Sequence, residues 1–490
     1  MRGIMECLRR NVLGIDIGTS SLKFLVTEPL DGGSRIVASV TRSYGLKSHG
    51  KQSVSLILKT FFEGLEAIAE ELALVTEICV CGQMHGIVWW CSRDLLEAAK
   101  RLYRNGCGDH WPWSDLITWE DQRCSEAFLR ECNSYCDDEC DQLSKLASGY
   151  GIASFAHVVK SQPDFMSMYN YDTCGTIMDL MTSLLCGHDT PKQTCIDTMN
   201  ATSWGPFDSG QMRWNAKFLN ALQIPHNVLP RVRKHGDVAG KTVEAFGLPA
   251  DARVLVGMGD HPCSVVAAAY SPTGRTFLPN VTTVNFGTSG QVALILSETQ
   301  ISAMKTDVSG GFEVRPFFHN QWIGVAASLS GGNVLAWFLA QVNAWKEDLN
   351  SEKPITMSEL IALGMGRKRT TLTCSPTIFG ERFASGLHGS FSNIRADNFG
   401  IGDMMAALCR GLVDNLVRMI PQSLRELALS QTIIGTGNGL IRNELLRFYL
   451  MGSLTHPDNL QIVDEALEDR FTAVFGATLV TRLEAPTSSV

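Results

Sequence analysis

The sequence predicts an α/β protein built from two similar lobes, with a ligand cleft between the lobes. A strand–Gly-Thr-Ser–strand phrase occurs twice, as IGTSSLKFL at residues 17–25 and as FGTSGQVAL at residues 286–294. The chain has 490 residues, which is too long for a single hydrophobic core. Short apolar runs alternate with helical apolar spacing along the chain, as in α/β proteins.

Each Gly-Thr-Ser turn is a candidate phosphate loop. A glycine lets the backbone turn tightly and lets a phosphate approach closely. Hydroxyls and backbone N–H groups in such a turn form an anion-binding nest. Two copies in one chain indicate a nucleotide held between two lobes. Two ordinary hairpins are the alternative, because a single Gly-Thr-Ser match is only a hypothesis.

The first half of the chain begins as a three-stranded meander followed by a helix. The apolar pattern predicts strands at 12–17, 22–27, 35–41 and 77–81, with a helix over 53–74 between the last two. A strand at 253–258 then ends in Gly-Asp and leads into a helix over 261–270. Pro262 lies in the first turn of that helix, where proline is favoured.

The second half repeats this scheme. Strands are predicted at 282–286, 291–296 and 321–326, followed by a helix over 333–342. A long amphipathic helix is expected over 404–420, and a buried strand at 431–435 opens into GTGNG at 435–439. The sequence therefore predicts one lobe over about 12–262 and a second over about 263–485.

Composition restricts the partners. The net charge is −8 and there is no basic block, which argues against nucleic acid as a partner. No apolar run reaches the length of a membrane span, and the first residues lack the apolar core of a secretory signal. The 15 cysteines are scattered, as expected for reduced thiols in the cytoplasm. Cys132, Cys136 and Cys140 have helical-face spacing, but this is not a common metal-site spacing.

Acidic residues next to the loops suggest a metal and a base. Asp16 precedes the first Gly-Thr-Ser and is placed to hold Mg2+, although an Asx-turn is the alternative. Asn285 takes its place in the second copy, so only the first loop is expected to face the metal. Lys23 is placed to neutralise phosphate charge. Asp260 follows a strand, where an α/β fold holds its ligands, and is the candidate general base, with a helix N-cap as the alternative.

Other clusters suggest contacts for a sugar and a nucleoside. Gln83-Met84-His85 follows a buried strand, and residues 119–123 combine a tryptophan, two carboxylates, an amide and a guanidinium. A structural histidine and a helix N-terminus are the respective alternatives. Gly331-Gly332 and GTGNG are further glycine turns that are placed to flank a nucleoside, although such turns are common in α/β proteins.

Taken together, the motifs resemble the FGGY family of carbohydrate kinases. The shared motifs, in order, are DIGTSSLK at 16–23, GQMHG at 82–86, TWEDQR at 118–123, GMGD at 257–260, NFGTSG at 285–290 and GER at 380–382. The resemblance covers nearly the whole chain and implies the two-lobed actin-like, ribonuclease-H-like ATPase fold. GQMHG is typical of the xylulokinase-like branch. NATSWGPF at 200–207 and PTIFGER at 376–382 look most like the sedoheptulokinases.

The resemblance implies a role for each matching residue. It makes Asp260 the catalytic aspartate. From their positions beside the loops, Asp16 and Asp260 are also the expected metal ligands for Mg2+. The resemblance places the sugar on the first lobe through Met84, His85 and Asp121, and the polar clusters add Gln83 and Arg123 as expected sugar contacts. It places ATP on the first phosphate loop and the second lobe, through Gly18, Thr19, Ser20, Lys23, Gly287, Thr288, Ser289, Gly331, Gly332, Gly437 and Asn438.

The expected activity is ATP-dependent phosphorylation of the terminal hydroxyl of a small-molecule ketose, in first place sedoheptulose. The expected partners therefore exclude nucleic acid and membrane, and the chain is expected to be a monomer or a homodimer. A xylulokinase or another ketose or polyol kinase is the alternative within the family. A non-catalytic actin-like nucleotide-binding protein is the alternative from another class. The family's first signature is not seen, and residues 155–160 read FAHVVK instead.

Overall fold

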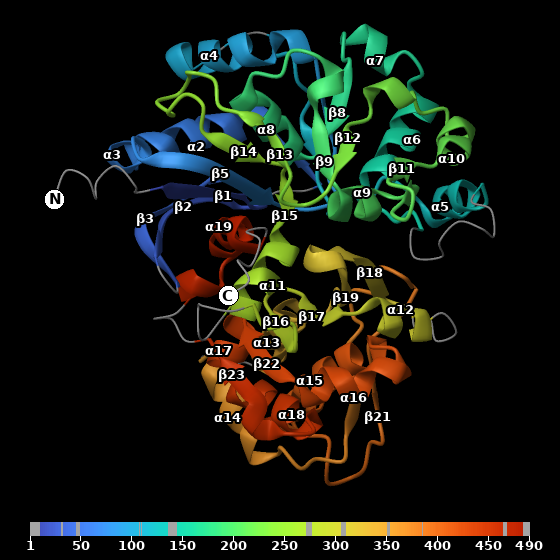
Figure 1. The fold of residues 1–490 in the computed structure, drawn as a ribbon. Coiled ribbons are helices and arrows are strands. Elements are labelled where there is room, and N and C mark those ends of the chain that lie inside the picture. Colours follow the sequence, from blue (N-terminus) through green and yellow to red (C-terminus); the bar gives the residue numbers. More distant parts are fainter. Residues whose placement is uncertain are drawn as a thin grey trace, which may run out of the picture. The chain divides into compact units, whose positions relative to one another are not determined.

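The computed structural model describes residues 10–30, 33–45, 50–106, 108, 110–135, 145–270, 277–304, 310–349, 353–384, 386–463 and 468–483. The chain divides into two compact units, which Figure 1 shows as a ribbon. The first unit takes in the chain up to residue 277, residues 315–319 and the segment from residue 469. The second unit takes in residues 278–314 and 320–468.

A seven-stranded sheet forms the centre of the first unit. Its strand order is β13 (Val238–Lys241), β14 (Arg253–Leu255), β5 (Val75–Gly82), β1 (Asn11–Ile17), β2 (Ser21–Leu30) and β3 (Gly33–Ser43), with β15 (Met258–Gly259) also paired to β5. β1, β2 and β3 form an antiparallel meander, whereas β5 runs parallel to β1 and to β14. Every residue of β1 is buried, as its apolar run predicts.

Helices cover both faces of this sheet (Figure 1). α2 (Val54–Glu66) and α8 (Ile177–Cys186) lie on one face, and α11 (Asp260–Tyr270) and α19 (Ala473–Leu483) lie on the other. α19 packs closely, because a Cβ on Gly14 of β1 would lie 2.7 Å from the carbonyl oxygen of Val474. The last described helix of the chain therefore completes the core of the first unit.

Residues 87–232 contribute a second core to the first unit, which the sequence pattern did not predict. Its large buried side chains include Trp89, Phe155 and Trp204. Its strands pair as β6 with β8, β9 with β12 and β10 with β11. The remaining elements of this unit are β4 (Lys51–Gln52), α3 (Ala69–Leu72), β6 (Val88–Trp90), α4 (Leu95–Asn105), β7 (Leu116–Ile117), α5 (Glu126–Asn133), α6 (Gly151–Ser161), α7 (Phe165–Met168), β8 (Thr173–Gly175), β9 (Cys195–Asp197), α9 (Thr198–Trp204), β10 (Phe207–Asp208), β11 (Arg213–Trp214), α10 (Ala216–Ala221) and β12 (Arg231–Arg233).

The sheet of the second unit repeats the pairing scheme of the first. Its order is β18 (Phe312–Phe317), β19 (Gln321–Ser328), β17 (Gly290–Leu296), β16 (Val281–Phe286), β22 (Thr432–Thr436) and β23 (Leu460–Ile462). β16, β17 and β19 form an antiparallel meander, and β22 runs parallel to β16 and to β23. The strands that flank each Gly-Thr-Ser phrase thus occupy equivalent positions in the two sheets.

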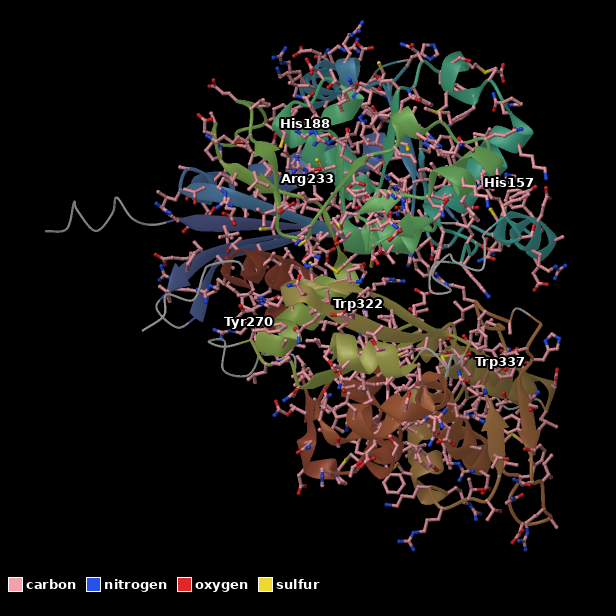
Figure 2. The ribbon with its side chains drawn as sticks, turned by 45° about the vertical axis from the view of Figure 1, so that its right-hand side comes forward. His157, His188, Arg233, Tyr270, Trp322 and Trp337 are labelled. Carbon is pink, nitrogen blue, oxygen red and sulfur yellow. The ribbon has the colours of Figure 1, made fainter. Side chains whose placement is uncertain are left out.

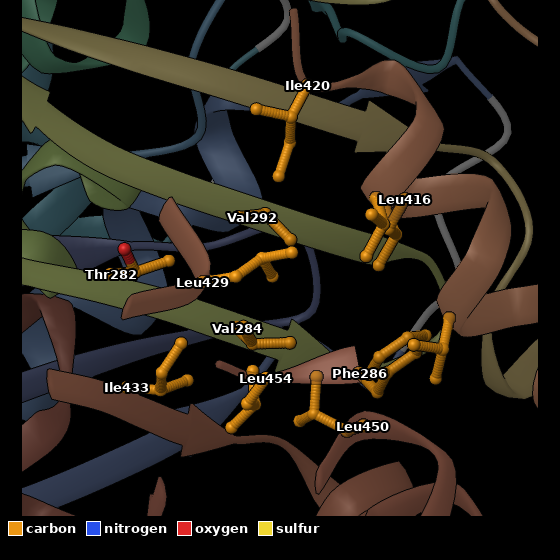
Figure 3. Close-up of a pocket in the computed structure, with 12 residues that line it drawn as sticks. Thr282, Val284, Phe286, Val292, Leu416, Ile420, Leu429, Ile433, Leu450 and Leu454 are labelled. Carbon is orange, nitrogen blue, oxygen red and sulfur yellow. The ribbon is translucent and has the colours of Figure 1, made fainter. Parts of the chain in front are cut away.

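The helices of the second unit enclose an apolar core against this sheet. Figure 3 shows Val284, Val292, Leu416 and Leu450 lining a small apolar pocket there, with no charged group in its lining.

Figure 2 labels Trp337 on α13, and it labels Tyr270 at the end of α11 in the first unit. The elements are α12 (Glu298–Met304), α13 (Gly332–Asp348), α14 (Met357–Gly366), β20 (Thr373–Ser375), β21 (Ser390–Ser392), α15 (Ile401–Met419), α16 (Gln422–Ser430), α17 (Asn438–Arg442) and α18 (Glu444–Ser453).

Most predicted elements are present, and two differ. The helix expected over 53–74 is two helices, α2 and α3, because α2 ends at Glu66. The strand expected over 253–258 is split into β14 and β15, and the intervening Gly257 carbonyl accepts a bond from Asn200 instead (3.4 Å). Among the described residues, no helix is both long enough and apolar enough to span a bilayer.

Candidate active site

Asp16 lies at the end of the buried strand β1, at the edge of the sheet where β1 and β5 both finish. It pairs in register with Lys23 on β2 and with Cys81 on β5. Burial raises the pKa of Asp16 to about 6, and the positive charge of Lys23 partly offsets that rise. Its Oδ1 atom is buried without a hydrogen-bond partner. A buried carboxylate oxygen without a protein partner is available to water, a ligand or an ion.

Asp260 lies at the same edge of the sheet. The strand that precedes it, β15, pairs with β5 so that Gly259 faces Gly82, and Asp260 then begins α11. Its Oδ1 accepts a hydrogen bond from the His261 backbone N–H (2.7 Å). The pKa of Asp260 is raised to about 7, first by burial and then by the negative charge of Asp16. A carboxylate with a pKa near 7 is suited to accept a proton at neutral pH.

The first Gly-Thr-Ser loop is held by side chains from three separate segments. Trp119 Nε1 donates to Thr19 Oγ1 (3.1 Å), and Gln52 Nε2 donates to the Thr19 carbonyl. Gln83 Nε2 donates to Gln52 Oε1 (2.7 Å) and to the Gly18 carbonyl (3.4 Å). Gln83 therefore supports the candidate phosphate loop, and its prediction as a sugar-binding residue did not include this contact.

The backbone of this loop closes on itself while its hydroxyl-bearing residues remain accessible. The Gly18 N–H donates to the Ser21 carbonyl (3.0 Å), and the Tyr44 N–H donates to the Ser20 carbonyl (3.0 Å). Gly18 and Thr19 are half-buried, and Ser20 is exposed. The loop is therefore preorganised by the fold and open on one side, as an anion-binding turn must be.

Met84 and His85 follow Gln83 in the chain, and Met84 packs against Gly259, the residue before Asp260. A Cβ on Gly259 would lie 2.5 Å from Met84 Sδ, so this glycine lets Met84 pack next to the catalytic candidate. His85 has a φ of 74°. This left-handed backbone conformation is strained for a residue other than glycine, and such strained residues cluster at functional sites. Its ring stacks on Tyr150 with centroids 4.5 Å apart, and its Nδ1 lies 3.3 Å from the Ser203 carbonyl oxygen.

Asp121 and Arg123 form a bidentate ion pair in a loop. Arg123 Nε donates to Asp121 Oδ1 (2.7 Å), and Arg123 Nη2 donates to Oδ2 (2.9 Å). This loop is not the helix N-terminus that the alternative interpretation required, because α5 begins later, at Glu126. Gly50, with a φ of 80°, lies against it, where a Cβ would be 3.0 Å from the Asp121 Cα.

In the second unit, the three predicted glycine turns come together. A Cβ on Gly331 would lie 2.5 Å from the Ser289 carbonyl carbon, and one on Gly437 would lie 2.6 Å from the Phe286 carbonyl oxygen. The Gly332 N–H donates to the Gly287 carbonyl (2.8 Å), and the Asn333 N–H donates to the Thr288 carbonyl (3.1 Å). Asn438 begins α17 directly after Gly437 and is exposed.

The structure also places Arg315 near Met84 and the buried Asp197 within electrostatic reach of Arg315, and the sequence interpretation singled out neither. Asp197 is fully buried and caps α9, accepting from the Asn200 N–H (2.9 Å). Burial raises the pKa of Asp197 to about 7, against the opposing effects of the Asn200 and Met199 N–H bonds and, last, of the positive charge of Arg315. Arg315 is itself buried and lies with Nη1 3.8 Å from Met84 Sδ. The NATSW motif at 200–204 was the available signal, but no role was assigned to it.

The residues present fit a magnesium ion bound with few protein ligands. The unpartnered Asp16 Oδ1 and the neighbouring Asp260 supply two carboxylates. Mg2+ is held by one or two carboxylates together with water and substrate phosphates. Within the described residues, no group of three histidine, cysteine or acidic side chains is arranged for a metal. Cys132 is a buried free thiol, whereas Cys136 and Cys140 lie outside the described residues.

Comparison with known proteins assigns the family. Residues 11–267 match the family model for the N-terminal domain of the FGGY family of carbohydrate kinases. The chain belongs to this family. The sedoheptulokinase of Mus musculus is 31% identical over 489 residues, covering 96% of each chain. The sedoheptulokinase of Homo sapiens is 32% identical over 457 residues, covering 89% of this chain and 91% of the human protein.

A solved structure of an FGGY-type kinase confirms the fold. The xylulose kinase of Rhodospirillum rubrum aligns with a TM-score of 0.73 at 18% identity, covering 98% of this chain and 91% of that chain. The predicted two-lobed actin-like α/β fold is therefore correct. Family membership makes the chain a carbohydrate kinase, with ATP as its co-substrate.

Proposed function

We propose that this FGGY kinase transfers the terminal phosphoryl group of ATP to the terminal hydroxyl of sedoheptulose, giving sedoheptulose 7-phosphate. The observation that carries the proposal is the pair Asp16 and Asp260 at one edge of the first sheet, with a pKa near neutrality for Asp260. The substrate is proposed from the mouse and human sedoheptulokinases, which match this chain over nearly its full length.

Asp260 is proposed as the general base. Phosphoryl transfer to an alcohol needs a carboxylate that orients the hydroxyl and accepts its proton. The bond from His261 to Oδ1 leaves Oδ2 as the atom for that proton. The negative charge of Asp16 favours proton uptake by Asp260, and Asp16 is proposed to hold Mg2+ through its unpartnered Oδ1. When bound, Mg2+ would neutralise charge that develops on the phosphoryl oxygens.

The sugar is proposed to lie against the segments that surround Asp260. Met84 packs against Gly259, next to Asp260, and the Tyr150 stack fixes the plane of the His85 imidazole. The ion pair of Asp121 and Arg123 offers a carboxylate and a guanidinium in fixed geometry to sugar hydroxyls. A ketose with many hydroxyls requires such paired, preorganised groups, since unpaired buried hydroxyls are costly.

The nucleotide is proposed to contact the converging glycine turns of the second unit and the first loop. In the second unit, Gly287–Ser289, Gly331-Gly332 and Gly437-Asn438 supply close backbone approach. In the first unit, the contacts are Gly18, Thr19, Ser20 and Lys23. We further propose that the enzyme acts in the cytoplasm, where its free thiols such as Cys79 and Cys81 stay reduced, and that it is a monomer or a homodimer.

A specificity profile tests this proposal. ADP release is measured with Mg-ATP and, in turn, sedoheptulose, xylulose, ribulose and fructose. We expect the highest kcat/KM for sedoheptulose. A higher value for xylulose would replace the proposal with a xylulokinase. ADP release that none of the sugars increases would reject a ketose kinase.

A further inference from the structure

The GER motif at 380–382 has no part in the machinery described so far, yet its glutamate is buried in the second unit. Glu381 is 1% exposed. Oε1 accepts hydrogen bonds from the Ser328 hydroxyl and from Asn415 Nδ2 (2.9 Å), and Oε2 accepts from the Leu329 N–H (2.9 Å). All three partners donate, so the carboxylate is held as an acceptor only.

Two of those donors belong to the turn that joins β19 to α13. Ser328 ends β19, and Gly331-Gly332 begins α13 after only two more residues. A second bond ties the same turn to the segment that carries Glu381, because Ser330 Oγ donates to the Pro376 carbonyl (3.0 Å). The Ser330 N–H also donates to Ser328 Oγ (3.0 Å), which links the two bonds.

The far end of this turn shapes the second phosphate loop. Gly332 and Asn333 donate their backbone N–H groups to the carbonyls of Gly287 and Thr288. Gly331 contacts Ser289 so closely that a Cβ would lie 2.5 Å from the Ser289 carbonyl carbon. A continuous set of hydrogen bonds and contacts therefore runs from Glu381 through the turn to the Gly287–Ser289 loop.

We propose that Glu381 is a positioning residue for the nucleotide, acting through the β19–α13 turn and not by touching the ligand. The inference rests on the proposed function, in which Gly287–Ser289 and Gly331-Gly332 hold ATP. A buried carboxylate with only donor neighbours fixes the turn more firmly than an amide, because charge-assisted bonds are stronger than neutral ones.

Glu381→Gln is the decisive substitution, because it keeps the shape but adds an NH2 group. That NH2 must face the Leu329 N–H or the Ser328 and Asn415 donors. A binding or catalytic group that is displaced by about 1 Å can lower the rate of an enzyme by up to about a hundredfold. We therefore expect the Kd for ADP, measured by calorimetry, and the KM for ATP to rise roughly tenfold to a hundredfold. The KM for the sugar should stay within about twofold, since the sugar-binding candidates belong to the first unit and the turn belongs to the second.

A swap of donor and acceptor provides the rescue. In the double variant Glu381→Gln with Asn415→Asp, the amide introduced at position 381 donates to the carboxylate introduced at position 415 and to Ser328 Oγ. The Ser328 hydroxyl then donates to the carboxylate at position 415. The double variant should recover most of the ADP affinity that each single variant loses. Ser328→Ala is the milder alternative if Glu381→Gln does not fold, and it should weaken ADP binding in the same direction.

Glu359→Gln is the matched control. Glu359 accepts bonds from the Thr356 N–H and hydroxyl at the start of α14, in the same unit and away from the turn. It should leave the Kd for ADP unchanged. A folded Glu381→Gln or Ser328→Ala protein with normal ADP affinity overturns the inference, as does a double variant no better than the single ones. A wild-type protein that does not bind ADP overturns the proposed function and this inference together.

Discussion

Replacing Asp260 by asparagine should abolish most of the activity while making the fold more stable. Asparagine keeps an oxygen that can accept the His261 bond, so the start of α11 is preserved. It cannot accept the hydroxyl proton. We expect kcat at saturating sugar and Mg-ATP to fall by about 10²–10⁴-fold, the range typical for loss of a general base.

The gain in stability follows from the raised pKa of Asp260. That pKa rises from 3.8 to about 7 on folding, so the stabilising contribution of the protonated carboxyl is complete below pH 3.8. The contribution is lost as the pH rises through about 7. The difference corresponds to at most about 4 kcal/mol, at about 1.4 kcal/mol per pKa unit, and solvent screening of this partly exposed group reduces it.

Thermal unfolding at pH 5 and pH 8, measured beside kcat, checks both effects. The Tm of Asp260→Asn should exceed that of the wild type at pH 8, with a smaller difference at pH 5. Asp251→Asn is the control, since Asp251 is exposed and has a φ of 65° that asparagine tolerates. Unchanged kcat in Asp260→Asn would refute the base assignment, and equal Tm shifts at both pH values would refute the electrostatic argument.

Three further predictions follow from the same geometry. Asp16→Ala should lower kcat with Mg-ATP, because the transition state loses several kcal/mol of stabilisation, while the affinity for the sugar is retained. Near-normal kcat would show that Asp16 serves only as a turn residue. Gly331→Ala should weaken ADP binding by calorimetry, because its Cβ would lie 2.5 Å from the Ser289 carbonyl carbon; unchanged affinity would exclude this contact from the site. In the wild type, kcat should rise with pH through about 7 as Asp260 ionises; a profile flat from pH 5 to 9 would contradict its role.

The sequence predicted those features that depend on local patterns. The repeated Gly-Thr-Ser phrase, with its flanking apolar runs, led to both meanders and to the convergence of Gly287, Gly331 and Gly437. Each of these predictions rests on strand periodicity or on a glycine at a turn, and both signals can be read from one short stretch of sequence. The raised pKa of Asp260 depends instead on its burial and, after that, on the negative charge of Asp16, which is remote in sequence, so both effects required the three-dimensional structure.

The features that were missed depend on contacts between distant segments. The second core of the first unit is built on strands of two or three residues, such as β6 and β9, which are too short to show a period. α19 packs on β1 at Gly14 and on α11 at Gly476, where a Cβ would meet the backbone of Cys263, and no sequence pattern reveals either close approach. Glu381 was visible only as part of a motif, because its partners Ser328 and Asn415 lie far along the chain.

The two strand–Gly-Thr-Ser–strand segments have the same backbone arrangement but different side-chain chemistry. Asp16 and Asn285 occupy equivalent positions, each near the end of the strand before the glycine and each paired across an antiparallel neighbour. Asp16 faces Lys23 in register and keeps an unpartnered buried oxygen, whereas Asn285 is exposed and donates to Thr436 Oγ1 (3.1 Å). A carboxylate in the second position would add negative charge beside a loop proposed to hold phosphate. The change from acid to amide therefore fits the proposed roles, in which the first unit holds the metal and accepts the proton, and the second unit contacts the nucleotide through neutral backbone groups.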